Sequence, residues 1–571
     1  MKSDLVRILD GNIFVLSGGS GDIETQPSGP CGFFSFDTRF LSLWRLTING
    51  ERVSALAVDD PSYFEVRFFL VPGAPTHYVD AKVSVIRERS VAGSFEERLT
   101  VLNHSGEPAE FTVRLDADGD FTPLAVVLGQ EHTRAGRLYR YVEDGCLHIG
   151  YVREKFRRET VISTTEPAHV DEQGLTYHIR IEPHGRWTTT LHVRGLVLRP
   201  DGQDIRDHVY PGPIRRDPVR LHDDLRRWLG KAPRLSCDWK LVERAYERSL
   251  VDLAALRFSP LTLPSEPLPA AGLPWAATLT GRDPIITSLQ ALPFTPELAV
   301  HTLRMLGTDQ GTVLDDELDE EPGKILREFR YGELVAFEEC PQAPYYGAAD
   351  TTPLYVILLD EYERWTGDAA TVREFEDEAR AALHWIDEYG DLMGDGYIWY
   401  QRRNERNGLE NQCWKDSPDS ISFRDGRLAS LPRATCELQG YAYDAKIRGA
   451  RLARQFWHDP AYADRLEREA ADLKERFNRD FWIPDGEYYA LALDGDGRQV
   501  DALSSNIGHL LWSGIVDESR APKIAEHLLS PHLFSGWGVR TLATGQGRYN
   551  PLGYHVGTVW PFDNSFIAWG L

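Results

Sequence analysis

Residues 462–481, YADRLEREAADLKERFNRDF, decide the fold class of the second half of the chain. Large apolar side chains recur there at steps of three or four, at Tyr462, Leu466, Ala470, Leu473, Phe477 and Phe481. Such steps place one apolar stripe along an α-helix and leave charged residues on the opposite face. Residues 354–365 and 372–386 repeat the pattern. The second half is therefore predicted to be a group of amphipathic helices that share a core.

About nine such helices are predicted, and the loops between them are long and dense in Trp, Asp and Glu. This organisation favours the paired helices of an (α/α)6 toroid-type barrel, which needs twelve. The last residues, DNSFIAWGL (563–571), are predicted to form an unfinished apolar helix without a capping exit. We therefore expect a barrel that is truncated at its C-terminus. A domain-swapped or partner-completed barrel is the alternative.

The first half has the pattern of short antiparallel strands. Stretches such as FEVRFFLV (64–71), AEFTVRLDAD (109–118) and TTTLHVRGLVL (188–198) alternate apolar and polar residues between turn signals, with no helical period between them. This pattern is typical of a β-sandwich. Residues 199–218 are rich in Pro, Gly and charge and mark a connection. The predicted domains are a sandwich at 1–205, a linker at 206–235 and the incomplete helical barrel at 236–571.

Composition limits the class of protein. A chain of 571 residues is too long for one core, since cores stop growing at roughly 250 to 300 residues. The formal charge of −24 disfavours nucleic-acid binding, which needs clustered Lys and Arg. Fifteen Trp and 23 Tyr suit the stacking of sugar rings, although large helical cores also use them.

Targeting and metal motifs are missing from the sequence. Asp4, Arg7 and Asp10 interrupt any apolar leader, and no run of about 18 apolar residues occurs, so a cytoplasmic protein without membrane spans is expected. The six cysteines form no CxxC pair, and no P-loop, GxSxG or HExxH motif is present. No metal or cofactor is predicted, and the pattern does not define an oligomeric state.

A carboxylate beside aromatic residues is the strongest chemical signal. Glycoside cleavage needs one protonated carboxyl that donates to the leaving oxygen and a second carboxylate that activates water or attacks carbon. In the loop ENQCWKDSPD (410–419), Asp416 follows Trp414 by two residues. An apolar neighbour of this kind raises a carboxyl pKa, whereas Lys415 would lower it if it pointed inward. A loop Asp that accepts hydrogen bonds or caps a helix is the alternative.

Two further motifs contain candidate sugar-binding groups. Arg282 and Asp283 in GRDP (281–284) precede a predicted helix, where Asp283 is either the N-cap or, with Arg282, a ligand for sugar hydroxyls. The loop GYHVGTVWPFDN (553–564) brings together His555, Trp560 and Asp563. From spacing alone, a structured loop is the favoured interpretation of this third motif.

Together these motifs resemble the bacterial amylo-α-1,6-glucosidase, or glycogen-debranching, family along nearly the whole chain. The front domain contains CGFFSFDTRFLSLWRLTING (31–50). Seven motifs of the back domain follow in the family's order: AAGLPWAATLTGRDPIITSLQAL, EEPGKILREFRYGEL, YYGAADTTPLYV, ENQCWKDSPDSI, CELQGYAYDA, FSGWGVRTLA and NPLGYHVGTVWPFDNSFIAWGL.

The resemblance implies an inverting glycoside hydrolase with a barrel similar to that of glucoamylases. Asp416 matches the general acid of such enzymes, and Arg282 and Asp283 match the pair that holds the non-reducing sugar. The same cavity would be lined by Tyr346, Asp350, Trp414, Lys415, His555, Trp560 and Asp563. The expected reaction releases glucose from terminal α-glucosidic bonds, with α-1,6 bonds of a glycogen-like oligosaccharide as the expected substrate.

Departures from the family pattern keep alternatives open. Thr280, Pro284, Arg327 and Cys413 stand where the family commonly has an aromatic residue, Ser, His and Gly. The resemblance places the general base on a Glu beyond Leu571, and Glu437 is not assigned to that role because helix burial is expected for it. A disaccharide or oligosaccharide glucosidase of the same barrel type and a non-catalytic carbohydrate-binding protein are the alternatives. The sandwich is expected to brace the barrel, with glycan binding as its alternative.

Overall fold

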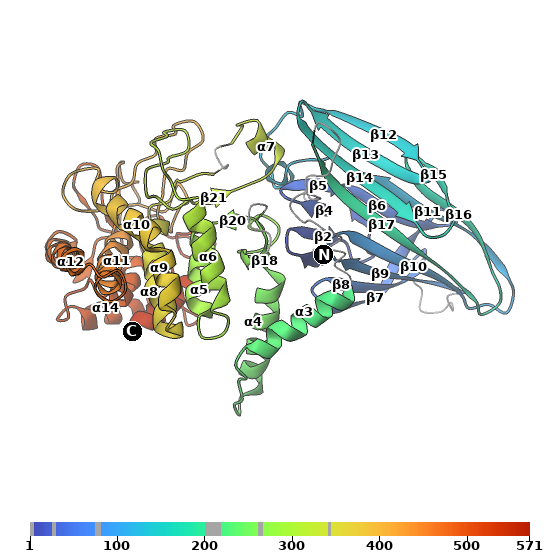
Figure 1. Ribbon diagram of the computed structural model, residues 1–571. Helices are drawn as coiled ribbons and strands as arrows, with labels where there is room; N and C mark the ends of the chain where they lie inside the picture. The colour runs from blue at the N-terminus through green and yellow to red at the C-terminus, as the bar shows by residue number, and fades with distance from the viewer. Residues whose placement is uncertain (1–4, 26–29, 75–81, 200–217, 261–265, 341–343) are drawn as a thin grey trace. The chain divides into compact units, whose positions relative to one another are not determined.

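The computed structural model describes residues 5–25, 30–74, 82–199, 218–260, 266–340 and 344–571. The chain forms two compact units (Figure 1). The sandwich unit holds Met1–Leu279 and Arg330–Glu339, and the helical unit holds Thr280–Phe329 and Cys340–Leu571. The units thus divide at Leu279, whereas the sequence placed a linker at 206–235. Residues 206–217 of that linker lie outside the described residues, and α3 (Pro218–Lys231) occupies most of the remainder.

Two antiparallel sheets build the sandwich unit. Among the described residues, the smaller sheet has the order β1-β2-β4-β5, and the larger has thirteen strands in the order β12-β13-β14-β17-β10-β9-β8-β7-β6-β11-β16-β15, with β3 paired to β6. Their bounds are β1 (Val6–Asp10), β2 (Ile13–Ser17), β3 (Ile23–Glu24), β4 (Gly32–Ser35), β5 (Thr38–Leu41), β6 (Leu43–Ile48), β7 (Glu51–Ser62), β8 (Glu65–Pro72), β9 (Val83–Val91), β10 (Phe95–Asn103), β11 (Ala109–Asp118), β12 (Arg137–Glu143), β13 (Cys146–Arg153), β14 (Phe156–Thr164), β15 (His169–Asp171), β16 (Gly174–Ile181) and β17 (Arg186–Leu198). The predicted antiparallel β domain is confirmed.

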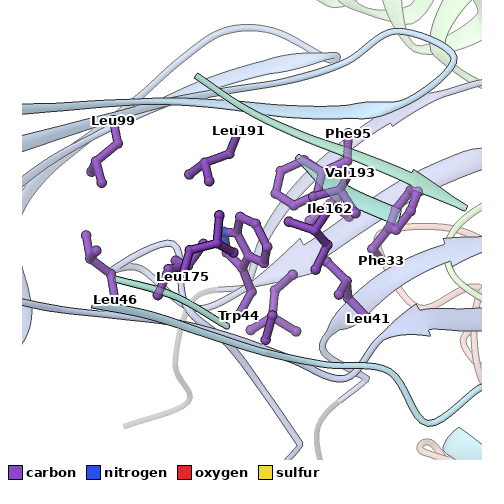
Figure 2. Packing of buried hydrophobic residues seen from close by; sticks show 14 of the residues in the cluster. Phe33, Leu41, Trp44, Leu46, Phe95, Leu99, Ile162, Leu175, Leu191 and Val193 are labelled. Atoms are coloured by element: carbon purple, nitrogen blue, oxygen red, sulfur yellow. The ribbon is translucent and has the colours of Figure 1, made fainter. Parts of the chain in front are cut away.

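The alternation read from the sequence produces the core of this unit. In β11, Phe111, Val113 and Leu115 are buried while the residues between them are partly exposed, because successive strand side chains point to opposite faces. Figure 2 shows the cluster that these inward positions form around Trp44, whose ring meets Phe95 at 5.5 Å. Each large apolar side chain buried in this way contributes roughly 1.5 to 3 kcal/mol.

Buried charges lie inside the same sandwich. Glu97 accepts hydrogen bonds from Arg87 at 3.0 Å, from Arg89 at 2.6 Å and from the indole of Trp44 at 3.2 Å. Glu97, Arg87 and Arg89 have fully buried side chains. Burial raises the pKa of Glu97, but the two guanidinium groups outweigh it and hold the pKa below its usual value. The core therefore depends on a compensated charge cluster as well as on apolar packing.

Short helices and two-residue strands complete the two units. Among the described residues, the helices outside the helical unit are α1 (Leu124–Val127), α3, α4 (Lys240–Ala255) and α7 (Glu333–Ala336). The two-residue strands are β18 (Arg257–Phe258), β19 (Leu268–Pro269), β20 (Leu279–Thr280), β21 (Glu328–Phe329), β22 (Ala434–Thr435), β23 (Trp482–Ile483), β24 (Tyr488–Tyr489), β25 (Ala492–Leu493) and β26 (Gln499–Val500).

The helical unit confirms the periodicity read from the sequence. Within the described residues its helices are α5 (Arg282–Ala291), α6 (Glu297–Thr308), α8 (Thr351–Thr366), α9 (Ala369–Glu374), α10 (Glu376–Glu388), α11 (Cys436–Gln455), α12 (Pro460–Asp480), α13 (Asn506–Ser513), α14 (Ala521–Leu529) and α15 (Pro561–Gly570). The predicted stripe of α12 is buried at Leu466, Ala470, Leu473 and Phe477, and Tyr462 is partly buried. Asp459 caps the N-terminus by accepting from the backbone N–H of Tyr462.

The helices pack in chain order. Helix α8 packs against α5, α6, α10 and α11, while α11 also contacts α12 and α13, and α13 contacts α14 and α15. Gln290 of α5 donates to the hydroxyl of Ser565 in α15 at 2.5 Å, so the first and last helices of the unit also meet. Across the described parts of the chain, no helix has both the length and the apolar character that a membrane crossing requires.

Candidate active site

The loop that contains Asp416 is fixed by a buried asparagine. The side-chain amide of Asn411 donates to the carbonyl of Ser417 at 2.8 Å, and its oxygen accepts from Tyr400 at 2.9 Å and from Arg433 at 2.5 Å. Asn411 is fully buried. These bonds close the loop from both sides, so the backbone on either side of Asp416 is held without a helix or strand.

Two arginines from distant parts of the chain converge on Asp416. Arg327 donates to Oδ2 of Asp416 at 3.0 Å, and a terminal nitrogen of Arg282 lies 3.7 Å from the same oxygen. Arg282 is itself oriented by Asp350, whose Oδ2 accepts from Nε at 2.6 Å, and by the carbonyl of Cys413 at 2.9 Å. The side chain of Asp350 is fully buried. The structure thus joins Arg282, Asp350 and Asp416, and it adds Arg327.

These arginines reverse the expected titration of Asp416. Burial raises its pKa, as the sequence predicted from Trp414, but Arg327 and then Arg282 outweigh burial and hold the pKa below its usual value. The prediction of a raised pKa is therefore wrong for the protein without substrate. Its physical reason is that opposite charges within hydrogen-bond range favour the ionised carboxylate more strongly than burial disfavours it.

The pKa of Asp283 is shifted in the opposite direction to that of Asp416. Burial raises its pKa, and the neighbouring Arg282 offsets this only in part. The N-cap of α5 is Gly281, so Asp283 lies in the first helical turn and the N-cap alternative is wrong. A carboxyl that retains its proton more readily than usual can donate as well as accept a hydrogen bond, which suits the recognition of a hydroxyl group.

An aromatic cluster surrounds Trp414. Its ring meets His555 at 5.2 Å, Trp560 at 6.1 Å and Phe562 at 5.1 Å, each nearly perpendicular. Tyr554 packs on His555 at 4.4 Å and on Trp560 at 4.8 Å and remains largely exposed. Trp560 is fixed by donating its indole N–H to the carbonyl of Tyr554 at 2.7 Å. The indole N–H of Trp414 is buried and has no hydrogen-bond partner among the described residues.

Burial favours the neutral form of His555. Its Nδ1 lies 3.0 Å from the hydroxyl of Ser417, directly after Asp416 in the chain. Burial lowers the pKa of His555 to about 4, although the charge of Asp416 opposes the shift. The third sequence motif is therefore joined to the loop of Asp416 through Ser417 and Trp414.

Asp563 and Lys415 are buried and make hydrogen bonds to other buried groups. Oδ1 of Asp563 pairs with Nε2 of His509 at 2.7 Å, and Nδ1 of His509 meets the hydroxyl of Tyr441 at 2.5 Å. The ring of His509 stacks parallel to Trp414 with centroids 6.1 Å apart. Lys415 donates to the carbonyl of Thr541 at 2.5 Å, and burial lowers its pKa to about 8. The side chain of Asp563 is fully buried.

Tyr346 and Glu437 make hydrogen bonds to residues other than those around Asp416. The hydroxyl of Tyr346 donates to the carbonyl of Asp309 at 2.8 Å. Glu437 is fully buried in α11, and its two oxygens accept from Thr435 at 2.9 Å and from Asn506 at 2.8 Å. The expectation that Glu437 is a buried helix residue is confirmed.

Sequence reasoning missed three residues of this arrangement. Arg327 was noted only as a departure from the family pattern, yet it donates directly to Asp416. Tyr554 stood beside His555 in a quoted motif and was not selected. His509 lies in α13, where its position in an apolar helix gave no chemical signal. A buried histidine between Leu and Gly residues is the one signal that could have drawn attention to it.

Comparison with known protein families separates the same two regions. Residues 8–192 match the profile described as the N-terminal domain of some glycogen debranching enzymes. Residues 335–571 match the profile described as a mannosylglycerate hydrolase MGH1-like glycoside hydrolase domain. A search among curated proteins finds no significant relative.

The solved structures that match this chain resemble it only weakly. A GH63 mannosylglycerate hydrolase from Thermus thermophilus in complex with glucose has 15% identity and a TM-score of 0.40 over 57% of this chain and 85% of its own. A GH78 family rhamnosidase from a Bacillus species has 14% identity and a TM-score of 0.36 over 73% of this chain, which spans 40% of the rhamnosidase. A sialidase has 10% identity and a TM-score of 0.44 over 98% of this chain and 53% of its own. TM-scores this low do not support an argument, so the assignment is made from the family profiles.

The chain is a glycoside hydrolase, with a debranching-enzyme N-terminal domain in front of a hydrolase domain. The match over residues 8–192 agrees with the resemblance to the glycogen-debranching family that the motifs carry.

Proposed function

We propose that the protein releases glucose from terminal α-glucosidic bonds, with the α-1,6 bonds of glycogen-like oligosaccharides as the preferred substrate. One observation carries the proposal. A buried carboxyl, Asp416, lies between two guanidinium groups and beside the ring cluster of Trp414, His555, Trp560 and Tyr554. Charged hydrogen-bonding groups next to exposed and half-buried aromatic faces are the combination that a pyranose requires.

In the proposed mechanism Asp416 gives its proton to the glycosidic oxygen as the bond to the anomeric carbon breaks. A water molecule adds to that carbon from the opposite face and loses its proton to a second carboxylate, so the anomeric configuration inverts. Arg282 and Asp283 hold hydroxyls of the non-reducing sugar, Asp350 orients Arg282, and the rings of Trp414, His555 and Trp560 line the sugar. Tyr346 supports the wall of the proposed sugar-binding cavity. Lys415 and Asp563 act on the sugar indirectly, by holding Trp414 in position.

Proton donation needs a change in the charges around Asp416. In the free site Arg327 favours the ionised carboxylate. We infer that a sugar bound against Asp416 replaces the N–H of Arg327 with the glycosidic oxygen and removes water, and both changes raise the pKa of Asp416. The site tightens toward its reactive geometry only when substrate is present.

The base is not assigned to a described residue. An inverting pair is separated by roughly 6.5 to 9.5 Å to admit water. Glu437 is excluded from this role because both of its oxygens accept buried hydrogen bonds. We also propose that the helical unit is part of an (α/α)6 toroid-type barrel and that the protein is cytoplasmic.

Product analysis with a substrate panel tests the function. Limit dextrin, isomaltose, maltose and trehalose separate a debranching activity from a disaccharide hydrolase, and mannosylglycerate tests the activity in the name of the matched hydrolase profile. We expect glucose chiefly from limit dextrin and isomaltose. Asp416→Asn should abolish release while calorimetry still detects sugar binding.

Three results would overturn parts of this proposal. Activity of Asp416→Asn within tenfold of the unchanged protein would remove the acid assignment. Release of mannose from mannosylglycerate, with none of glucose from the glucosides, would replace the substrate. Tight oligosaccharide binding without any product would favour the non-catalytic carbohydrate-binding alternative.

A further inference from the structure

We propose that a pocket within the helical unit is a second carbohydrate site, separate from Asp416, which takes one neutral pyranose unit. The side chains that carry the proposal line this pocket together: Lys324, Trp385, Trp399, Tyr400, Arg403 and Gln412. All of them belong to the helical unit. The described residues that line the pocket include neither Asp416 nor the two arginines that contact it. The proposal goes beyond the proposed function, because this second site needs no catalysis by Asp416.

The size of the pocket suits a single sugar ring. Its volume is about 80 Å³, and since one water needs about 10 to 15 Å³ of such a cavity, it has room for roughly five to eight waters. One pyranose with its hydroxyl groups displaces a water cluster of that order, whereas a longer oligosaccharide would extend beyond the pocket. Leu392 and Gln401 are exposed residues of the lining, so a ligand can enter from solvent.

Three aromatic side chains offer ring surfaces to this ligand. Trp385, Trp399 and Tyr400 line the pocket and are each at most 3% exposed. The indole N–H of Trp385 donates to Glu321 at 2.7 Å. The indole N–H of Trp399 donates to Asp395 at 2.9 Å. Because both indole N–H groups already have partners, a ligand meets these two side chains as apolar surfaces, which suit the C–H face of a pyranose.

Two cations of the pocket share one carboxylate. Nζ of Lys324 lies 3.1 Å from Oε2 of Glu321, and Arg403 also donates to this carboxylate. The same Nζ donates to the carbonyl of Asp319 at 3.1 Å. An ammonium group has three N–H donors, so one of those on Lys324 remains for a ligand. With the buried carboxylate of Asp319, these four side chains carry no net formal charge.

Gln412 adds an acceptor to these donors. It is 2% exposed, and its Nε2 donates to Oδ2 of Asp319 at 3.1 Å. Its side-chain oxygen accepts no hydrogen bond from the described residues. Hydroxyl groups can use this acceptor and the donors of Lys324 and Arg403 together. An anion could use only the donors and would face the oxygens of Gln412 and Glu321, so the arrangement favours a neutral, hydroxyl-rich ligand.

The wall of the pocket continues into the segments that orient Arg282. The backbone N–H of Ala349 donates to the carbonyl of Gln412 at 2.7 Å. The next residue in each segment, Asp350 and Cys413, accepts a hydrogen bond from Arg282. A sugar in the pocket therefore contacts both segments that hold this arginine.

Hydrogen exchange measured by mass spectrometry, with and without glucose, tests the pocket independently of catalysis. Asp283→Ala removes a proposed sugar contact of the candidate active site and leaves the pocket unchanged. Trp399→Phe and Arg403→Gln alter the pocket at a ring and at a donor. Their matched controls are Trp365→Phe and Arg427→Gln, because these two side chains are mostly exposed and do not line the pocket.

We expect glucose to slow exchange at residues 319–325 and 398–403 in the unchanged protein, in Asp283→Ala and in both controls. The glucose affinity obtained from this protection should be roughly fivefold weaker in Trp399→Phe and in Arg403→Gln. Calorimetry with glucose should show two sites in the unchanged protein and one in Asp283→Ala. Sulfate and glycerol, an anion and a small polyol, should protect neither segment.

Unchanged exchange at 319–325 and 398–403 in the unchanged protein with glucose overturns the proposal. Equal protection by sulfate or glycerol, or equal weakening in the two control variants, also overturns it. Protection confined to residues 414–417 and lost in Asp283→Ala supports the candidate active site and rejects the pocket. Protection of the pocket segments in a protein that releases glucose from none of the substrates supports the pocket and rejects the proposed function instead.

Discussion

Arg327 donates to Oδ2 of Asp416 across 3.0 Å, although 89 positions separate the two residues in the chain. This hydrogen bond joins the segment directly before β21 to the loop that carries the candidate acid. It also determines which form of the carboxyl the free protein favours, because Arg327 contributes more than Arg282 to the lowered pKa of Asp416.

Replacing Arg327 by Ala should therefore raise the pKa of Asp416. A general acid acts in its protonated form, so the basic limb of kcat/KM should move to higher pH. The same substitution also changes how the stability of the fold depends on pH. A depressed carboxyl pKa stabilises the fold above the unfolded pKa, and this stabilisation is lost as the pH falls through the folded pKa.

The Arg327→Ala variant should consequently lose less of its unfolding free energy on acidification than the unchanged protein. Arg454→Ala serves as the control, because Arg454 pairs with Asp464 and Glu467 on an exposed helical surface. A basic limb that shifts equally in both variants would contradict the assignment of Arg327.

His555 should make the protein sensitive to mild acid. Its pKa is lowered to about 4 from an ordinary 6.5. Between those values the unfolded chain binds a proton that the folded protein does not, so stability falls as the pH decreases. The full effect is about 3 kcal/mol, as an order of magnitude. Unfolding in urea at pH 7 and pH 4.5 measures it.

The His555→Asn variant should lose part of this pH dependence. His169→Asn should retain all of it, because His169 is exposed on β15. Equal pH dependence of the unchanged protein and His555→Asn would show that other groups cause the acid sensitivity.

Asp563 should affect sugar binding through Trp414. Asp563→Asn weakens the bond to His509, whose ring stacks on Trp414. We expect a roughly tenfold loss of oligosaccharide affinity, about 1.4 kcal/mol. His509→Asn should cause a similar loss, and the double variant should be little worse than either single variant, since both changes interrupt one network. Additive losses in calorimetry would instead indicate that Asp563 binds the sugar directly.

Glu97 should be essential for the stability of the sandwich unit. Glu97→Gln leaves Arg87 and Arg89 without their shared buried carboxylate, and loss of one partner of a buried pair costs about 3 to 5 kcal/mol. Glu96→Gln is the matched control, because Glu96 lies on the opposite face of β10 and pairs with the half-exposed His192. Similar urea midpoints for the two variants would refute the importance of the cluster.

The sequence alone was sufficient to predict structural features that depend on residues close together in the chain. The apolar steps in α12 and the alternation in β11 follow from side-chain geometry that repeats along a single element. The family resemblance of the motifs GRDP, ENQCWKDSPD and GYHVGTVWPFDN also implied that Arg282, Asp416 and His555 share one cavity. Hydrogen bonds and ring contacts join Asp350 and Trp560 to the same site, which agrees with the resemblance.

The tertiary structure decided what these residues can do chemically. A pKa depends on charges within a few ångströms in a partly dry environment. For Asp416 those charges come from Arg282 and Arg327, far away in the chain, while its sequence neighbour Lys415 donates to Thr541 instead. Local pattern therefore determined the elements and the candidate residues of this protein. Contacts between distant segments determined the ionisation of the acid, because only folding brings those charges together.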